Sequence, residues 1–241
     1  MNPADLPLDL DALLAGLRPW IECESPTFDV AAVNRMMASE LVAAGAIVTR
    51  FPGPPGLGDC LRGDFPHPRR AEPGILMMSH LDTVHPVGTL KTLPFRRDGW
   101  RCYGPGILDM KGGAYAGLQA IIALAKAGIE TPLPVSVLFT SDEEIGSPGT
   151  RDLIMEQARR HRFILVPEPG RPGNGVVTGR YAIARFNLLA EGRPSHAGSQ
   201  LKNGRSAISM MAQQLLAIEA MTDDDCTFSV GVIQGGQWVN C

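Results

Sequence analysis

The sequence of 241 residues is short of cysteine pairs, long apolar runs and basic charge. Its five cysteines lie far apart and none form a Cys-x-x-Cys pair, so we expect reduced thiols rather than disulfides or a thiolate zinc site. The 22 basic and 25 acidic residues give a net charge of −3, without the basic signature of nucleic-acid binding. No apolar run reaches the roughly 18 residues of a membrane span, and no secretory signal opens the chain. These absences predict a cytoplasmic location and no membrane or nucleic-acid partner.

Two common catalytic motifs are also missing. Without a Gly-x-Ser-x-Gly elbow, a serine hydrolase is disfavoured. Without a Gly-x-Gly-x-x-Gly turn between a strand and a helix, a dinucleotide-dependent enzyme is disfavoured. What is present is an ordinary globular composition, with 44% hydrophobic residues and a mean hydropathy of +0.02. This amount of apolar material can build the core of one large domain or of two unequal ones.

Strand and helix patterns alternate over most of the chain. The expected helices span residues 8–24, 29–44, 110–127 and 147–160. The expected strands span residues 46–51, 59–64, 74–79, 134–140 and 163–166. Asp29 and Ser147 are placed as helix N-caps, and the strand at 59–64 is expected at a sheet edge. The alternation predicts a three-layer α/β/α domain with a largely parallel sheet.

The pattern changes after about residue 175. We expect a strand at 176–191, a helix at 204–221 and a strand at 227–233. This order is typical of the first half of a split βαβ, or ferredoxin-like, domain. The predicted organisation is therefore a metal-binding catalytic domain over residues 1–176 and an incomplete lid or dimerisation domain over residues 177–241.

Acidic or histidine-bearing turns follow the predicted strands and the Gly-rich segment at 104–106. Their chemically active residues are His80, Asp82, Asp109, Glu143, Glu144 and Glu168. In an open α/β sheet, ligands bind outside the carboxyl ends of the strands, where such loops converge. One imidazole with several carboxylates at that point favours a zinc site, and their number favours two metals.

Each motif also has an ordinary interpretation when it is taken alone. His80 and Asp82 share one face of a strand end by their spacing of two, but taken alone the pair favours a surface loop. Asp109 is compatible with a simple helix N-cap, and Glu143 and Glu144 with an acidic loop before a helix. The turn around Glu168 is compatible with a proline-rich surface turn.

In this order, the turns resemble the zinc-dependent peptidase and deacylase family that includes glutamate carboxypeptidases, acetylornithine deacetylases, succinyl-diaminopimelate desuccinylases and aminoacylases. The matching motifs are Ser79-His80-Leu81-Asp82-Thr83, Ile107-Leu108-Asp109-Met110-Lys111-Gly112-Gly113, Ser141-Asp142-Glu143-Glu144-Ile145-Gly146, Pro167-Glu168-Pro169-Gly170 and Gly192-Arg193-Pro194-Ser195-His196-Ala197-Gly198. The Ser-His-Ala-Gly form and the segment at 103–106 are most similar to the glutamate-carboxypeptidase branch.

The resemblance implies a role for each residue. It makes His80 and Glu168 ligands of one zinc, Glu144 a ligand of the other, Asp109 the bridge, Glu143 the general base and Asp82 the residue that orients His80. It also implies a cis peptide bond between Asp109 and Met110. His196 is expected to reach the active site of the partner subunit and hold the oxyanion, and Asn240 is expected to touch substrate.

The implied activity is metal-dependent cleavage of an amide bond in a small peptide or an N-acyl amino acid. The cofactors are expected to be two divalent ions, zinc first, with cobalt or manganese also compatible. The family pattern has a further histidine ligand beyond the lid domain, so we expect a C-terminally truncated chain whose full-length form is a homodimer. The alternative is a non-catalytic remnant that keeps the fold and binds one metal or none.

Overall fold

The computed structural model describes residues 6, 8–180 and 182–238. The chain divides into two compact units, residues 1–178 and residues 179–241. The assignment of the two parts as catalytic and lid domains stays a prediction. None of the described helices is long and apolar enough to cross a membrane.

The first unit contains a mixed sheet. Its strands are β1 Ile47–Phe51, β2 Cys60–Asp64, β3 Gly74–His80, β4 Arg96–Asp98, β5 Arg101–Tyr103, β6 Val135–Thr140 and β7 His161–Leu165. Five of them form one sheet in the order β1-β2-β6-β3-β7, and β4 and β5 form a separate antiparallel hairpin. β3 pairs in parallel with both β6 and β7, whereas the pairings of β2 with β1 and β6 are antiparallel. The α/β fold is confirmed. The edge position predicted for β2 is wrong, because β1 and β6 hydrogen-bond to its two sides.

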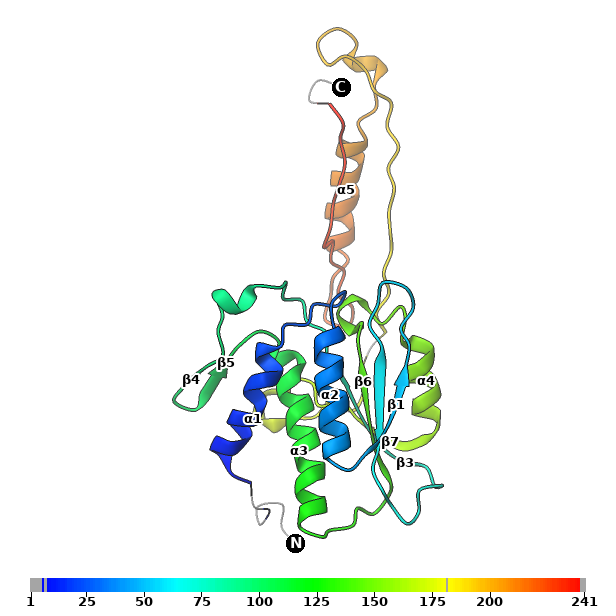
Figure 1. Cartoon of the computed structure of the whole chain (residues 1–241). Coiled ribbons are helices and arrows are strands. Elements are labelled where there is room, and N and C mark those ends of the chain that lie inside the picture. The colour runs from blue at the N-terminus through cyan, green and yellow to red at the C-terminus, as the bar shows by residue number, and fades with distance from the viewer. Residues whose placement is uncertain (1–5, 7, 181, 239–241) are drawn as a thin grey trace. The chain divides into compact units, whose positions relative to one another are not determined.

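Helices cover both faces of this sheet. The helices of the first unit are α1 Leu10–Glu22, α2 Ala31–Ala43, α3 Gly112–Lys126 and α4 Arg151–Arg159. Figure 1 shows α1, α2 and α3 on one side of the sheet and α4 on the other. The predicted cap at Asp29 is wrong. Val30 occupies the N-cap position of α2 and no side chain caps it, because a turn that bonds Asp29 N–H to the Pro26 carbonyl delays the helix.

The main core lies between the sheet and the helices α1, α2 and α3. Trp20 of α1 is fully buried and makes edge contacts with Tyr115 of α3 and Phe139 of β6, at centroid distances of 5.3 and 6.0 Å. Its indole N–H donates to the Glu40 carboxylate of α2 at 2.8 Å. One aromatic residue therefore joins three helices to the sheet.

The second unit contains one long helix, α5 Ala207–Glu219, which is capped by the Ser206 hydroxyl accepting from the Ser209 N–H at 3.0 Å. The strands predicted at 176–191 and 227–233 are wrong: over the described residues of these segments no strand is formed. Strands need a hydrogen-bonded neighbour, and in a split βαβ unit the two parallel strands are separated by another strand. Residues 176–191 and 227–233 are therefore not expected to pair with each other by backbone hydrogen bonds.

Candidate metal centre

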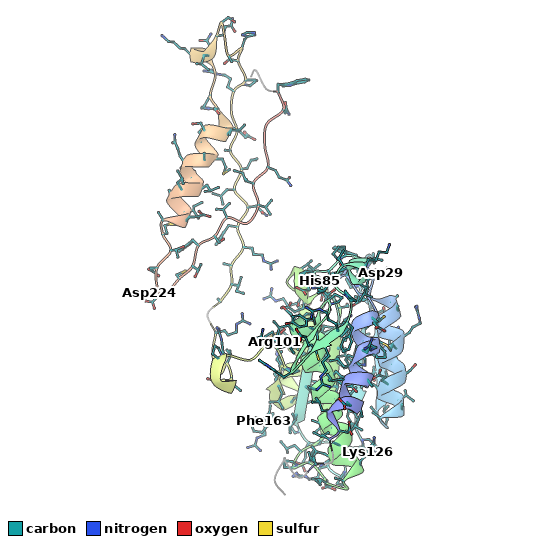
Figure 2. All side chains as sticks on the ribbon, turned by 90° about the vertical axis from the view of Figure 1, so that its left-hand side faces the viewer. Asp29, His85, Arg101, Lys126, Phe163 and Asp224 are labelled. Carbon is teal, nitrogen blue, oxygen red and sulfur yellow. The ribbon has the colours of Figure 1, made fainter. Side chains whose placement is uncertain are left out.

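Three parallel strands deliver side chains to one edge of the sheet. β3 and β6 run in register with His80 opposite Thr140, so the turns that follow them begin at the same level. The Leu81 N–H donates to the Thr140 carbonyl at 3.0 Å and continues this pairing one residue further. β7 lies parallel to β3 on its other side and leads to Glu168. In Figure 2, His85 of the turn after β3 lies at the end of the unit opposite to Lys126, the last residue of α3.

Carboxylates approach one nitrogen of His80. Its Nε2 lies 3.0 Å from an Asp109 oxygen, 3.5 Å from a Glu168 oxygen and 3.9 Å from a Glu143 oxygen. One possible ligand atom from each of His80, Asp109 and Glu144 lies within 4.8 Å of the other two. The His80 side chain is 1% exposed and that of Asp109 is 58% exposed, so a buried imidazole meets a carboxylate that is open to solvent.

The other nitrogen of His80 faces Asp82. Nδ1 lies 2.9 Å from the Asp82 backbone carbonyl oxygen and 3.3 Å from its Oδ1. Because both partners are acceptors, the proton of a neutral imidazole belongs on Nδ1, which leaves the Nε2 lone pair for a metal. The buried Asp82 carboxylate also accepts the backbone N–H groups of Glu143 and Glu144, each at 3.2 Å. It therefore holds the imidazole and the two-glutamate turn together.

Asp142 fixes the far end of the glutamate turn. Its buried carboxylate accepts the Gly149 N–H at 2.7 Å and the Thr150 hydroxyl. The predicted N-cap at Ser147 is wrong, because Ser147 has a φ of +56° and α4 begins only at Arg151. Asp142, rather than Ser147, supplies the side-chain oxygens that bind the residues just before α4.

The Asp109 turn precedes α3. The turn at Ile107–Lys111 is kinked: Asp109 and Met110 have non-helical backbone angles, and the peptide bond between them is cis, as the resemblance implied. Gly113, at the start of α3, lies against the turn that follows β7. A Cβ at Gly113 would be 1.8 Å from the Pro167 carbonyl oxygen. The glycine therefore allows the backbone next to Glu168 to pack on the backbone next to Asp109.

The charges of the cluster act on one another. Burial alone would lower the pKa of His80, but hydrogen bonds and charge from Asp82 and Glu168 outweigh it and raise that pKa to about 11. Burial raises the pKa of Glu143, and the charges of Glu168 and Asp109 add to this against the opposing effect of His80. Burial and the charge of Asp109 likewise raise the pKa of Glu144. Such a crowded set of carboxylates is stabilised by a cation.

The donor set fits divalent metal ions. One imidazole and carboxylate oxygens are ligands of catalytic zinc, and mixed sets of this kind also accept cobalt and manganese. Since Asp82 already fixes the ring of His80 from its far side, the imidazole is oriented before any ion binds. His80, Asp109, Glu144 and Glu168 are the residues that could hold such ions.

A cavity of about 270 Å³ adjoins two of these carboxylates. It is lined by Val84, His85, Gly104, Gly106, Ile107, Leu108, Asp109 and Glu144. Sequence reasoning gave no role to Val84 or His85, although both belong to the turn that follows Asp82. Their position directly after a strand end was the signal that could have found them.

Two predicted site residues belong to the second unit. His196 belongs to the second unit, where it is exposed and its Nδ1 accepts the Gly198 N–H at 3.1 Å. Asn240 lies outside the described residues. The roles of both remain predictions.

Comparison with known proteins gives the class of this chain. The profile of Peptidase family M20/M25/M40 matches residues 76–234. The chain belongs to this family, and the resemblance read from its sequence is confirmed.

Carboxypeptidase G2 of Pseudomonas sp. (strain RS-16) is 35% identical over 220 residues, which cover 89% of this chain and 52% of the relative. A probable carboxypeptidase of Aspergillus clavatus is 30% identical over 207 residues, 73% of this chain and 44% of the relative. The chain thus spans about half or less of these curated relatives.

Solved structures share the fold. A tripeptidase from Staphylococcus aureus matches with a TM-score of 0.71 at 19% identity, covering 97% of this chain and 63% of that one. An M20 family metallo-carboxypeptidase from Sulfolobus solfataricus matches with a TM-score of 0.57 at 19% identity, covering 69% of this chain and 39% of that one. At these identities, the likeness establishes the common architecture.

Proposed function

We propose that the protein represented by this chain uses two divalent metal ions to hydrolyse an amide bond in a peptide or an N-acyl amino acid. The single observation that carries the proposal is the cluster of His80, Asp109 and Glu144 at the carboxyl ends of parallel strands. Membership of a peptidase family and the likeness to named carboxypeptidases support the same reaction. The resemblance of its motifs to the glutamate-carboxypeptidase branch makes glutamate the first candidate for the released amino acid.

The ligands follow from the donor set and the family pattern. His80 and Glu168 would hold one ion, Glu144 the other, and Asp109 would lie between them. Zinc is the first candidate, with cobalt and manganese as alternatives. Bound ions of this kind supply positive charge that polarises a carbonyl and lowers the pKa of water toward neutrality.

Glu143 is proposed as the residue that moves the proton. Its carboxylate is 52% exposed and lies 3.9 Å from His80 Nε2, so it is next to the ligands without being enclosed. Its raised pKa brings its proton affinity closer to the value that suits a general base near neutral pH. Glu143 would take a proton from the attacking water and return it to the departing amine.

Further residues complete the proposal. Asp82 orients the imidazole of His80 through two acceptor oxygens. His196 would stabilise the oxyanion of the reacting carbonyl in the partner copy of a homodimer, and Asn240 would contact the substrate. Both assignments come from the family pattern.

Substitution of Glu143 tests the proposal. The chain, loaded with zinc, is incubated with N-acyl glutamates and dipeptides, and release of free amine is measured. Glu143→Gln keeps the size of the side chain and should reduce turnover by about 10²- to 10⁴-fold while bound zinc is unchanged. Glu156→Gln, at an exposed glutamate of α4 that pairs with Arg160, should leave turnover unchanged. Equal rates for the two variants would remove Glu143 from its role.

A second candidate is a non-catalytic protein that binds one metal or none. It is favoured by the donor count, because the cluster found among the described residues contains one imidazole only. The second ion is left with Asp109 and Glu144, whereas catalytic zinc usually has three protein ligands. Metal analysis after dialysis separates the candidates: two retained ions support the hydrolase, and one or none supports the non-catalytic protein.

A further inference from the structure

We infer that residues 23–27, named here the α1 exit segment, are a positioning element that fixes the two halves of the metal centre relative to each other. The inference rests on the proposed roles of Asp82 and Asp109. The segment follows α1 and reaches the centre twice: Thr27 bonds to Asp82, and Cys23 bonds to Lys111, two residues after Asp109.

The first contact sets the orientation of the Asp82 carboxylate. The Thr27 hydroxyl donates to Asp82 Oδ2 at 2.9 Å, and both residues are buried. Oδ2 also accepts the Glu144 N–H, while Oδ1 accepts the Glu143 N–H and faces His80 Nδ1 at 3.3 Å. The two oxygens thus have separate sets of partners. Without the hydroxyl, rotation of the carboxylate would exchange the partners and release the imidazole from its fixed direction.

Backbone contacts hold Thr27 in place for this bond. The Thr83 N–H donates to the Ser25 carbonyl at 2.9 Å, and Pro26 and Thr83 form a parallel bridge. The Ser25 hydroxyl donates to the Leu81 carbonyl at 2.6 Å. The α1 exit segment therefore lies along residues 81–83 through an isolated bridge and these hydrogen bonds, which brings the hydroxyl of Thr27 to the buried carboxylate of Asp82.

The second contact anchors the Asp109 turn. The Lys111 ammonium is buried, and it donates to the carbonyls of Trp20 at 3.1 Å and Cys23 at 2.7 Å. These carbonyls belong to the C-terminal end of α1, where the helix dipole favours a cation. Because burial of an ammonium is costly, a methionine would fill the same space at lower cost. What the ammonium adds is two directional bonds that locate the turn.

The proposal is tested at Thr27, with Thr131 as the matched control. Thr27→Val removes the hydroxyl at constant shape, Thr27→Ser keeps it, and Thr131→Val removes a part-buried hydroxyl bond to the Leu133 carbonyl, outside the α1 exit segment. Zinc affinity is measured with a competing chelator, and the site geometry is followed by the absorption spectrum of bound cobalt. Thr27→Val should bind zinc about 10- to 100-fold more weakly with an altered cobalt spectrum. Thr27→Ser and Thr131→Val should stay within about threefold of the parent chain.

A measurement without metal separates the proposal from the proposed function. In the metal-free chain, the ring resonances of His80 should shift in Thr27→Val and return in Thr27→Ser. Unchanged resonances and unchanged affinity in Thr27→Val would overturn the positioning role, even if the parent chain binds two ions. Absence of metal binding by the parent chain, together with shifted resonances, would overturn the proposed function and support the positioning role. Should Thr27→Val fail to fold, Thr27→Ala removes the same hydroxyl and takes its place.

Discussion

Zinc binding to the metal-free chain should release a proton from His80. Its pKa is raised to about 11 by Asp82 and Glu168 over the opposing effect of burial, so the imidazole carries two protons at neutral pH. A metal needs the Nε2 lone pair, and the proton on that nitrogen must leave. At pH 7, close to one proton per zinc is expected from this group. A histidine with an ordinary pKa of about 6.5 would release only about 0.24 protons.

The assay is calorimetric titration with zinc in buffers of different ionisation enthalpy, at pH 7 and at pH 8. The expected contribution of His80 stays near one proton at both pH values, whereas that of an ordinary histidine falls to about 0.03 at pH 8. Asp82→Asn removes a charge that raises the pKa of His80, so its proton count should fall. Ionisation of zinc-bound water occurs in both proteins and cancels in their difference.

The raised pKa of His80 also links the stability of the metal-free chain to pH. A base whose pKa is raised in the folded state adds stability below its unfolded pKa of about 6.5, and this stability is lost as the pH rises through about 11. The contribution of His80 to the stability of the metal-free protein should therefore decline steadily from about pH 6.5 upward and be gone above about pH 11. If the parent chain released only about 0.24 protons per zinc at pH 7, and no more than Asp82→Asn releases, the doubly protonated imidazole of His80 would be refuted.

Three further predictions concern the fold. Trp20→Phe should destabilise the chain by about 2–4 kcal/mol in urea unfolding at pH 7 and by less at pH 4, because burial raises the pKa of Glu40 and only the indole N–H opposes it. Cys60 is buried, and burial raises its pKa to about 11, so about one thiol in 1000 is ionised at pH 8 and iodoacetamide should modify it only in denaturant. Gly113→Ala should cost about 1–3 kcal/mol and weaken zinc binding, because the added methyl group meets the Pro167 carbonyl.

Each of these predictions has a control. Glu40→Gln should reduce the pH dependence of the Trp20→Phe effect, and an unchanged dependence would contradict the role of the partly buried Glu40 carboxylate. The exposed Cys226 should be alkylated in the native chain under conditions that spare Cys60. Gly231→Ala, where an added methyl group meets nothing within 4 Å, should leave stability and zinc binding unchanged.

Much of the first unit was predictable because its elements have strong local patterns. The apolar runs of β3 and β6 have the length and composition of strands covered on both faces, and both were placed within one residue of their observed bounds. The hairpin of β4 and β5 was missed, since the three residues of β4 are all charged and exposed and carry no alternation. The position of β2 inside the sheet depends on pairing with distant strands, which a local pattern does not encode.

The candidate site divides in the same way. The spacing of His80 and Asp82 predicted a common face, and their contact follows from that local geometry. The bond from Thr27 to Asp82 joins residues 55 positions apart, and neither neighbourhood carries a sign of the other. Asp142 and Lys111 were hidden for the same reason, since their partners are identified only by the folded backbone.

The shared carboxylate of Asp82 changes how mutations at this position should be interpreted. Four donors from three separate segments of the chain meet on it, so it holds these segments together and does not only orient the imidazole of His80. An Asp82 variant with a low rate would combine a reoriented imidazole of His80 with displacement of Glu143, the proposed proton acceptor. Rates from such variants therefore reflect the positions of several side chains as well as the loss of the Asp82 charge. Removing the hydroxyl of Thr27 changes a single hydrogen bond to Asp82 and keeps that charge.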